Sequence, residues 1–415
     1  MRIAIIGAGI SGLTAAYLLS NHHEVTLYEA DDRLGGHAHT VLVQGDGAPV
    51  PVDTGFLVYN DATYPLFIAL LERLGVSSRP TVMSFSYTDV ARHLEWKGST
   101  LNTIFAQRRN LLRPAFVRMV LDIVSFNRTL SALLAHDVSP ELTLRQVLAT
   151  QKWGRAFREW YLLPMGAAIW SANPQTFADI PARTLAEFFS RHGLLQTRGR
   201  PAWRTIAGGS REYVARIADH LEARGSVHVA TPVRHLRRGE SAVQVVTDGA
   251  TVEFDHVVVA CHSDQALALL EDPTAVETAV LGAIAYQSNE VTLHTDTTLM
   301  PASRRAWAAW NFRRERPDDP LATLTYDIST LQSLPGPTSY LVSLNSDHLI
   351  NPRAVIERFT YAHPVIDQAT VRAQAQRHAL GGNRTSFCGA YFGYGFHEDG
   401  VRSALEVCAA LGVNW

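Results

Sequence analysis

The chain begins with a short apolar run, a helical pattern and a second apolar run. Residues 3–6 are apolar and largely β-branched, which predicts a buried strand. Residues 10–19 follow helical spacing, and the apolar run at 25–28 predicts another strand. A strand, a helix and a strand in such close succession are typical of a parallel α/β unit.

The same periodicities predict the remaining elements. Helical spacing recurs in three segments: 65–74, 101–135 and 401–411. Alternating or continuous apolar runs predict strands at 82–87, 227–229, 242–246, 251–254, 255–261, 291–294, 323–326 and 339–343. The last three are separated by turns that carry Pro or Gly and predict an antiparallel sheet. Within the aromatic segment 151–175, Pro164 predicts a break in a helix, and the segment as a whole predicts core packing with some contribution to a pocket.

A glycine pattern joins the first strand to the first helix and gives this unit a function. Gly-x-Gly-x-x-Gly occupies residues 7–12, and Glu29 ends the second strand. Gly7 permits a tight turn, Gly9 lets the backbone approach a pyrophosphate, and Gly12 lets the helix lie close to the strand. The helix start at Ile10 and Ser11 offers free N–H groups to phosphate, and Glu29 can accept hydrogen bonds from an adenosine ribose. The pattern predicts a dinucleotide-binding site.

Composition narrows the class of protein. The 415 residues are 47% hydrophobic and 18% charged, which predicts a globular chain of two domains. A net charge of −2 gives no reason to expect nucleic acid binding. Three separated cysteines argue against a disulfide framework or a metal site. The first strand begins at Arg2, without a signal peptide or a transmembrane stretch, which predicts a cytoplasmic protein.

The residues after Glu29 carry a family resemblance. Ala30, Arg33, Gly35, Gly36 and His37 resemble the extended fingerprint of the flavin amine-oxidase superfamily, although a solvated loop with incidental glycines is the alternative interpretation. Further matching segments lie at 53–56, 208–213, 255–262 and 387–403, the last with Gly-x-Gly-Phe-His-Glu-Asp-Gly. Together they cover essentially the whole chain, which is also similar to the N-terminal domain of plant cyclopropane fatty acid synthases.

This resemblance implies the fold, the cofactor and its contacts. The fold class is α/β, with an FAD-binding Rossmann-like domain at 1–60, 201–265 and 381–415. A discontinuous α+β substrate domain occupies 61–200 and 266–380, as in the amine oxidase and p-hydroxybenzoate hydroxylase architecture. Besides the residues named above, FAD contacts are expected from six positions: Gly55, Phe56, Val233, Gly389, Gly395 and Phe396. Asp53 is either part of the approach to the flavin or an ordinary turn residue.

The same resemblance supplies candidate catalytic residues at the start of the last helix. His397 and Glu398 are expected near the flavin, where His397 is also a cofactor contact and a candidate acid or base. The alternative is that the pair only caps the helix, for which Asp399 is the expected N-cap. His37 is open to the same two interpretations, structural or placed over the flavin. Cys388 falls in a strand near the pyrophosphate, so FAD is expected to be noncovalent.

The implied activity is a flavin-dependent oxidoreductase that transfers hydride from a lipid or fatty-acyl substrate to flavin N5. Many amine oxidases of the superfamily hold a lysine in the region equivalent to 280–310, but the only lysines here are Lys97 and Lys152. This gap favours a dehydrogenase or desaturase over the first alternative, an FAD-dependent amine oxidase. A second alternative is a non-catalytic FAD-bearing partner of a lipid-modifying methyltransferase.

Arginines are interspersed along the helical segment 101–135. The favoured interpretation is a helix pair packed on the core with a solvated basic face, with Val124 among the core positions. The other interpretation is a membrane-peripheral surface that rests against anionic lipid.

Overall fold

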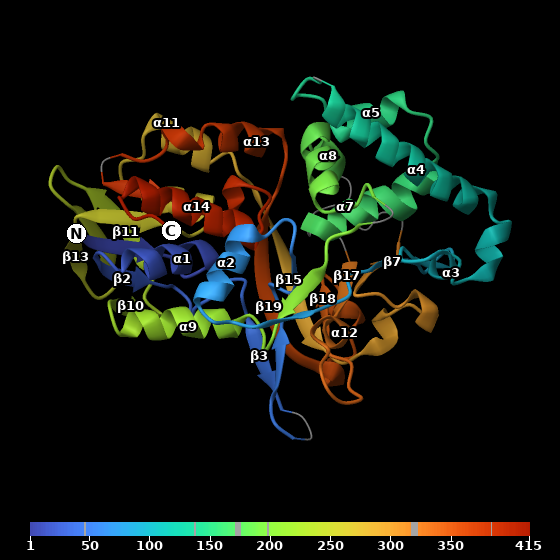
Figure 1. Cartoon of the computed structure of the whole chain (residues 1–415), viewed down its shortest axis with the longest axis horizontal. Coiled ribbons are helices and arrows are strands. Elements are labelled where there is room, and N and C mark those ends of the chain that lie inside the picture. The colour runs from blue at the N-terminus through green and yellow to red at the C-terminus, as the bar shows by residue number, and fades with distance from the viewer. Residues whose placement is uncertain (45–46, 137, 171–175, 197–198, 317–322, 383) are drawn as a thin grey trace.

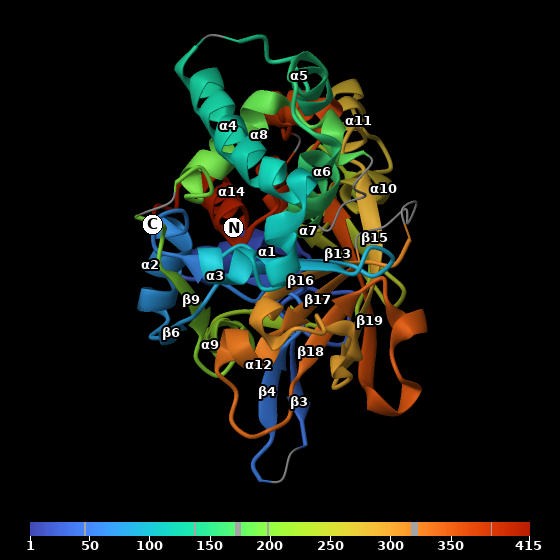
Figure 2. The ribbon, with the colours of Figure 1, turned by 90° about the vertical axis from the view of Figure 1, so that its right-hand side faces the viewer.

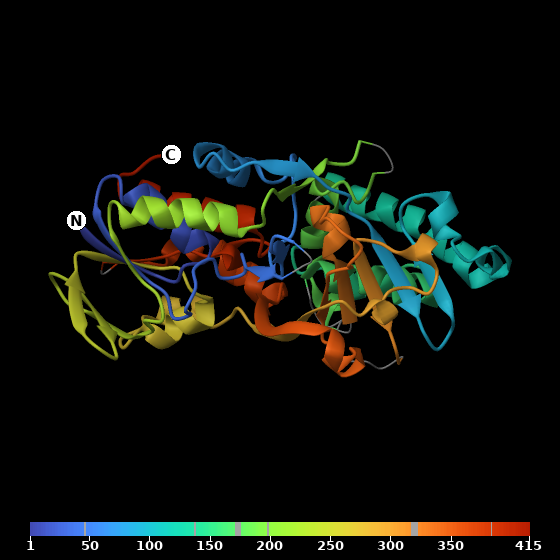
Figure 3. The same ribbon diagram turned by 90° about the horizontal axis from the view of Figure 1, so that it is seen from below.

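The computed structural model describes the whole chain except residues 45–46, 137, 171–175, 197–198, 317–322 and 383. The chain forms two lobes side by side (Figure 1), with both termini in one lobe and helices α3 to α5 at the far side of the other. Seen from below, the lobes meet along a narrow waist that several crossing segments span (Figure 3).

The first lobe is built on a five-stranded parallel sheet in the order β10-β2-β1-β14-β20. The strands are β1 (Arg2–Ile6), β2 (Glu24–Tyr28), β10 (Ser226–His228), β14 (His256–Val259) and β20 (Thr385–Phe387). Side chains of β1 alternate between two hydrophobic cores. Ile3 and Ile5 face helices α1 (Ile10–Leu19), α9 (Arg211–Glu222) and α14 (His397–Ala410). Ala4 and Ile6 face the antiparallel sheet of β11 (Val233–Arg238), β12 (Val243–Thr247) and β13 (Thr251–Phe254).

The second lobe is built on a seven-stranded sheet in the order β19-β15-β18-β17-β16-β7-β8. Its strands are β7 (Phe85–Asp89), β8 (Leu94–Lys97), β15 (Tyr286–His294), β16 (Trp310–Arg314), β17 (Thr323–Asp327), β18 (Leu341–Leu344) and β19 (Val355–Pro364). Neighbours pair antiparallel except β16 with β7, which are parallel. The strand predicted at 82–87 starts later, at Phe85, and Val82 is exposed.

Helices cover one side of this sheet: α3 (Leu101–Ile104), α4 (Pro114–Ala135), α5 (Leu144–Thr150), α6 (Arg155–Phe157), α7 (Leu163–Trp170) and α8 (Ala182–Arg191). The helical pattern predicted over 101–135 is divided, because a 3₁₀ turn at Arg108–Leu112 precedes Pro114, which begins α4. Phe116 and Leu130 are buried, as their helical spacing predicts, and Phe126 is buried as well. Val124 is not, and the prediction that it faces the core was wrong.

Pro164 does not break its helix, contrary to the sequence-based prediction. A π-helical turn at Arg158–Leu162 leads directly into α7, which contains Pro164 as its second residue. In a π turn the hydrogen bonds span five residues instead of four, and this wider spacing leaves room for the proline ring. The N–H that proline lacks is not needed as a donor at this position.

The remaining elements connect or flank the lobes. They are β3 (Thr40–Val43), β4 (Val50–Asp53), β5 (Tyr59–Asn60), α2 (Pro65–Arg73), β6 (Ser78–Pro80), β9 (Trp203–Ile206), α10 (Ser263–Leu269), α11 (Ala275–Leu281), α12 (Ile328–Gln332) and α13 (Gln368–Ala375). None of the described helices combines the length and the apolar character needed to cross a bilayer.

Candidate cofactor and active site

A single continuous cavity of about 1580 Å³ runs between the two lobes. It extends from the glycine turn of residues 7–12 to the inner side of α4 in the second lobe. Ordinary ligand pockets measure about 300–1,000 Å³, so this one has room for a dinucleotide and a second molecule.

The glycine turn forms one end of the cavity. A Cβ atom on Gly12 would lie 1.9 Å from the carbonyl oxygen of Gly7, so only glycine allows α1 to start this close to β1. A Cβ on Gly9 would meet nothing within 4 Å, because the space above it is the cavity itself. Helix α1 has no side-chain cap and no acidic residue in its first turn. Its N-terminal N–H groups, with Ile10 and Ser11 lining the cavity, suit an anion such as pyrophosphate.

Glu29 is held at the same end by backbone donors. Its carboxylate accepts hydrogen bonds from the N–H of Ala8 at 2.7 Å and from the N–H of Asp31 at 3.0 Å. A carboxylate accepts up to about four hydrogen bonds, so positions remain for ribose hydroxyls. Ala30 and Val233 line the cavity beside it.

The second glycine pair closes over the first. The N–H of Gly35 donates to the carbonyl of Ala8 at 2.9 Å, and a Cβ on Gly36 would lie 3.1 Å from the Cα of Gly9. The Arg33 guanidinium donates to the carbonyl of Gly36 at 2.8 Å, which orders the loop and leaves the arginine on the cavity wall. This geometry favours a ligand-binding loop over a solvated loop with incidental glycines.

Residues 53–56 run beside this loop. A Cβ on Gly55 would lie 2.1 Å from the carbonyl oxygen of His37, and the Phe56 N–H donates to that oxygen at 2.8 Å. Asp53 is buried and turned away from the described lining of the cavity. Its carboxylate accepts hydrogen bonds from Thr40 and Ser210 and from the side-chain amide of Gln332. Burial raises its pKa to about 6.

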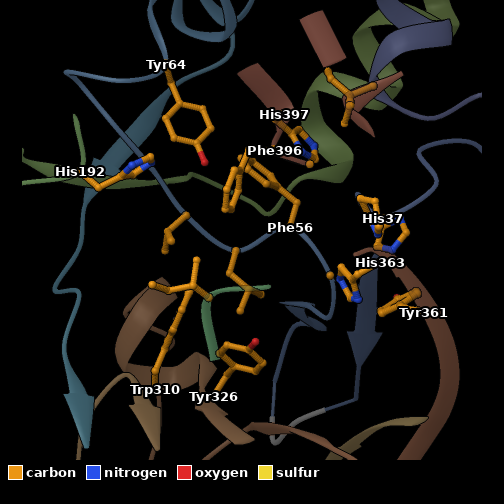
Figure 4. Close-up of a pocket in the computed structure, with 18 of the residues that line it drawn as sticks. His37, Phe56, Tyr64, His192, Trp310, Tyr326, Tyr361, His363, Phe396 and His397 are labelled. Atoms are coloured by element: carbon orange, nitrogen blue, oxygen red, sulfur yellow. The ribbon is translucent and has the colours of Figure 1, made fainter. Parts of the chain in front are cut away.

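A wall of aromatic and histidine rings follows next along the cavity (Figure 4). The ring of His37 lies 5.0 Å from Tyr361 and 5.1 Å from His363, measured between centroids. Burial lowers the pKa of His37 well below its ordinary value and that of His363 to about 4, so both rings are neutral near pH 7. Nε2 of His37 is shielded from solvent and has no hydrogen-bond partner among the described residues, which suits a ligand with a polar edge.

The start of α14 brings a second helix N-terminus to the cavity. His397 stacks on Phe56 with ring centroids 3.6 Å apart and an interplanar angle of 16°. A Cβ on Gly400 would lie 2.6 Å from Cγ2 of Ile10, so α14 and α1 touch near their first turns. Gly389, Gly395 and Phe396 also line the cavity, next to His397.

The structure corrects the roles expected at 397–399. Glu398 does not reach the described lining of the cavity, because its carboxylate accepts hydrogen bonds from the N–H groups of Leu66 and Phe67 at 2.9–3.1 Å and caps α2. Asp399 is the third residue of α14 instead of its N-cap, and it accepts the N–H of Phe396 at 3.1 Å. Burial lowers the pKa of His397 to about 3, so this ring is neutral near pH 7 and a weak base.

The part of the cavity in the second lobe, which we call the substrate chamber, is apolar. In Figure 4 the hydroxyl groups of Tyr64 and Tyr326 point into it from opposite sides, with Trp310 beside Tyr326. The aliphatic lining comes mainly from α4 and α7: Met119, Val120, Ile123, Met165 and Ile169. Sequence reasoning missed most of these positions, because they come from separate segments that carry ordinary core patterns.

Charge is scarce in the substrate chamber. Among its described lining residues between 64 and 203 and at 310 and 326, Arg200 is the one charged side chain. His192 is neutral near pH 7, because burial lowers its pKa to about 4. Lys97 points elsewhere and donates to the carbonyl of Trp307 at 2.8 Å.

Two cysteines lie near the cofactor end. Cys388 is buried and absent from the described lining of the cavity, and Cys261 lines it. Burial raises the pKa of the Cys261 thiol to about 12, which keeps it protonated and unreactive as a nucleophile.

Comparison with known sequences identifies relatives with flavin chemistry. Residues 10–358 match the family described as flavin containing amine oxidoreductase, which confirms the resemblance. A Mycobacterium tuberculosis protein named as a flavin-containing monoamine oxidase, AofH, is 26% identical over 287 residues, covering 65% of this chain and 59% of that protein. Zeta-carotene desaturase of Synechocystis sp. is 26% identical over 291 residues, covering 63% and 57%. The chain therefore aligns with less than two thirds of the length of these relatives.

Solved structures share the fold. Cyclohexylamine oxidase from Brevibacterium oxydans superposes with a TM-score of 0.71 at 18% identity, over 99% of this chain and 98% of that one. A CLA-producing fatty acid isomerase from P. acnes gives 0.70 at 15% identity, over 99% of both chains. These superpositions confirm the α/β fold, with its Rossmann-like parallel sheet and separate substrate-lobe sheet. Since the family match covers most of its length, the chain belongs to the flavin-containing amine oxidoreductase family.

Proposed function

We propose that the protein is an oxidoreductase that holds FAD noncovalently along the cavity. The glycine turn, Glu29 and Arg33 would hold the nucleotide and pyrophosphate. Phe56, His397 and the N-terminus of α14 would lie along the flavin. The open space above Gly9 and the unpartnered Nε2 of His37 fit such a ligand. The protonated Cys261 and the buried Cys388 support noncovalent binding.

We further propose that the substrate is a lipid or fatty-acyl chain. The observation that carries this proposal is the substrate chamber, whose described lining offers aliphatic and aromatic side chains but no carboxylate. An alkylammonium ion buried there would lack a counter-ion, at a cost of several kcal/mol. An alkyl chain would gain from every apolar contact it makes.

The chain's own residues would act by positioning and by excluding water. Aliphatic side chains from α4 and α7 would hold an alkyl segment, and the neutral rings of His192 and His397 would add no competing charge. FAD would supply a two-electron acceptor, so the substrate would lose a hydride to the cofactor and a proton to water and would gain a double bond. An external oxidant of the quinone or dioxygen class would take up the two electrons.

The relatives support more than one substrate class. A desaturase and a fatty acid isomerase are named among them, which agrees with an apolar substrate. Amine oxidases are named as well, and amine oxidation is the second candidate. Amine oxidation is disfavoured because the described lining of the substrate chamber contains no carboxylate and because Lys97 binds the carbonyl of Trp307.

Anaerobic reduction of the bound flavin tests these candidates. The purified holoprotein would be mixed with a fatty acid, a phospholipid or a primary alkylamine, and loss of the flavin absorbance would be followed. Bleaching by an acyl substrate alone is expected. Bleaching by amines alone would establish the amine oxidase instead, and bleaching by neither would favour a non-catalytic role beside a lipid-modifying methyltransferase. A protein that stays colourless after incubation with FAD would refute the cofactor assignment.

A further inference from the structure

We infer that α4 and the turn before it dock the protein on an anionic lipid surface, with the mouth of the substrate chamber facing the bilayer. The docking itself is independent of the reaction. Only the delivery of a membrane substrate through this mouth rests on the proposed function.

Exposed apolar side chains are concentrated in this region. The described structure exposes twelve large hydrophobic side chains, and six of them fall between residues 101 and 124: Leu101, Leu111, Leu112, Val117, Leu121 and Val124. Leu112 is 86% exposed and Leu121 is 66% exposed. A cluster of this kind on a soluble lobe marks an interaction surface.

Helix α4 carries two apolar faces. Phe116, Met119, Phe126 and Leu130 face the core, and Val117, Leu121 and Val124 form an exposed stripe on nearly the opposite side. A helix needs only one apolar face to pack on its own protein, so the exposed stripe has another partner. Figure 2 shows α3 and α4 together on the outer side of the second lobe.

The exposed stripe continues into the substrate chamber. Val124 and Leu101 are exposed, and both also line the cavity. Val120 and Ile123 lie between them and the interior; they line the cavity too and are partly buried. An alkyl chain can therefore pass from the outer surface to the interior along apolar side chains. This continuity places the mouth of the chamber at the exposed stripe.

The charge of the region selects the partner. Residues 101–135 contain five arginines, at 108, 109, 113, 118 and 128, and one acidic residue, Asp122. In the described structure Asp122 pairs with Arg118 at 3.7 Å. Arg108 donates to uncharged oxygens of Asn102 and Phe105, and Arg109 to the carbonyl of His93. These bonds leave the positive charges uncompensated, in a chain whose net charge is −2.

A membrane explains this combination better than a second copy of the chain does. A two-fold symmetric dimer through this face would bring the same arginines of both copies together, which is electrostatically unfavourable. Apolar side chains between arginines are instead the pattern of a helix that lies in the interface of an anionic bilayer.

Vesicle sedimentation of the holoprotein tests the inference. We expect binding to vesicles of phosphatidylcholine with phosphatidylglycerol, weaker binding to phosphatidylcholine alone, and weakening by salt. Leu121→Glu should reduce binding about tenfold, because it places a charge in the exposed stripe without touching the described cavity lining. Val276→Glu places the same charge at an exposed apolar site on α11, outside the exposed stripe (40% exposed, against 66% for Leu121); it is the control and should bind like the parent.

Three results would overturn the inference: no sedimentation with anionic vesicles, equal binding to neutral vesicles, or equal binding by Leu121→Glu and the control. A dimer in solution that Leu121→Glu dissociates would also overturn it. Flavin bleaching by a short soluble acyl substrate is measured in parallel and should be the same in Leu121→Glu and the parent. Vesicle binding without any bleaching would retain the docking and refute the proposed substrate. Bleaching without vesicle binding would retain the proposed substrate and refute the docking.

Discussion

Tyr213 on α9 and His397 at the start of α14 are joined by a buried hydrogen bond of 3.0 Å between the tyrosine hydroxyl and Nε2 of the imidazole. Burial raises the pKa of the tyrosine well above its ordinary value and lowers that of the histidine to about 3. Both partners are therefore neutral near pH 7. The bond fixes the orientation of the imidazole against Phe56 and ties α9 to the last helix.

The buried histidines make stability depend on pH. His37, His192, His363 and His397 have lowered pKa values in the folded state, so the unfolded chain binds more protons below its histidine pKa of about 6.5. Their contribution is complete above that pH and is lost as the pH falls towards 4 and below. Urea unfolding of the apoprotein at pH 7, 6 and 5 should show falling stability.

Two substitutions separate the contributions of His397 and Asp53 to the pH dependence of the free energy of unfolding. His397→Gln should make the fall shallower, by up to about 1.4 kcal/mol for each pH unit. Asp53 acts in the opposite direction, because its pKa is raised to about 6 and its contribution is lost as the pH rises through that value. Asp53→Asn should therefore steepen the fall between pH 4 and 6. A slope unchanged by His397→Gln would contradict the neutral buried imidazole.

Gly9→Val should abolish cofactor retention without unfolding the protein. A Cβ at this position meets no protein atom within 4 Å, so the valine side chain would extend into the space above Gly9 where the pyrophosphate is expected. We expect FAD affinity to fall at least about tenfold, measured by flavin titration of the apoprotein. Gly249→Val is the matched control, since a Cβ there also meets nothing within 4 Å and the residue lies outside the described cavity lining. Equal FAD affinity in the two variants would refute the placement.

Glu398→Gln should affect stability and leave turnover intact. The neutral side chain weakens the cap on α2, at a cost of about 1 kcal/mol in the free energy of unfolding. Glu72→Gln, at an exposed position of the same helix, should change neither quantity. A large loss of kcat with normal stability would return Glu398 to a catalytic role.

Val120→Trp should change the length of acyl chain that the protein accepts. Val120 lines the substrate chamber from α4, so the larger side chain fills space that a long alkyl substrate would need. We expect KM for long chains to rise about tenfold and that for short chains to change little. Ala132→Trp, at an exposed position of the same helix, is the control. A uniform loss across all chain lengths would indicate a packing defect instead.

Reoxidation of the reduced holoprotein by air should be slow. Lys97 binds the carbonyl of Trp307, and Lys152 is exposed, so neither lysine belongs to the described lining of the cavity. Stopped-flow mixing with oxygen and with a soluble quinone should show faster reoxidation by the quinone. Reoxidation by air at the rate of an ordinary oxidase would reverse the preference for a dehydrogenase.

Local patterns predicted the strand–helix–strand unit that carries the glycine turn. Gly7, Gly12 and Glu29 belong to one strand–helix–strand unit, and each has a steric or hydrogen-bonding requirement that its neighbours in sequence reveal. The roles of Glu398 and Asp399 were harder to predict, because both are carboxylates at a helix start. Which one caps which helix depends on α2, far away in the sequence.

The wall of histidine rings and the substrate chamber could not be predicted from local patterns. His37 and His363 meet only because β19 carries His363 across to the first lobe, and no periodicity encodes that contact. Val124 was wrongly predicted to face the core. Its helical spacing matched the core positions, but spacing cannot distinguish a second apolar face from the first when a helix has both.

The close contact between Gly400 and Ile10 has a consequence for biosynthesis. The first helix leaves the ribosome long before its neighbour α14 is made, and β1 also waits for β14 and β20 to complete its sheet. The binding site for the cofactor therefore closes only after nearly the whole chain has been translated. Until then the apolar surface of β1 and α1 lacks its native partners, which leaves the nascent polypeptide prone to aggregation.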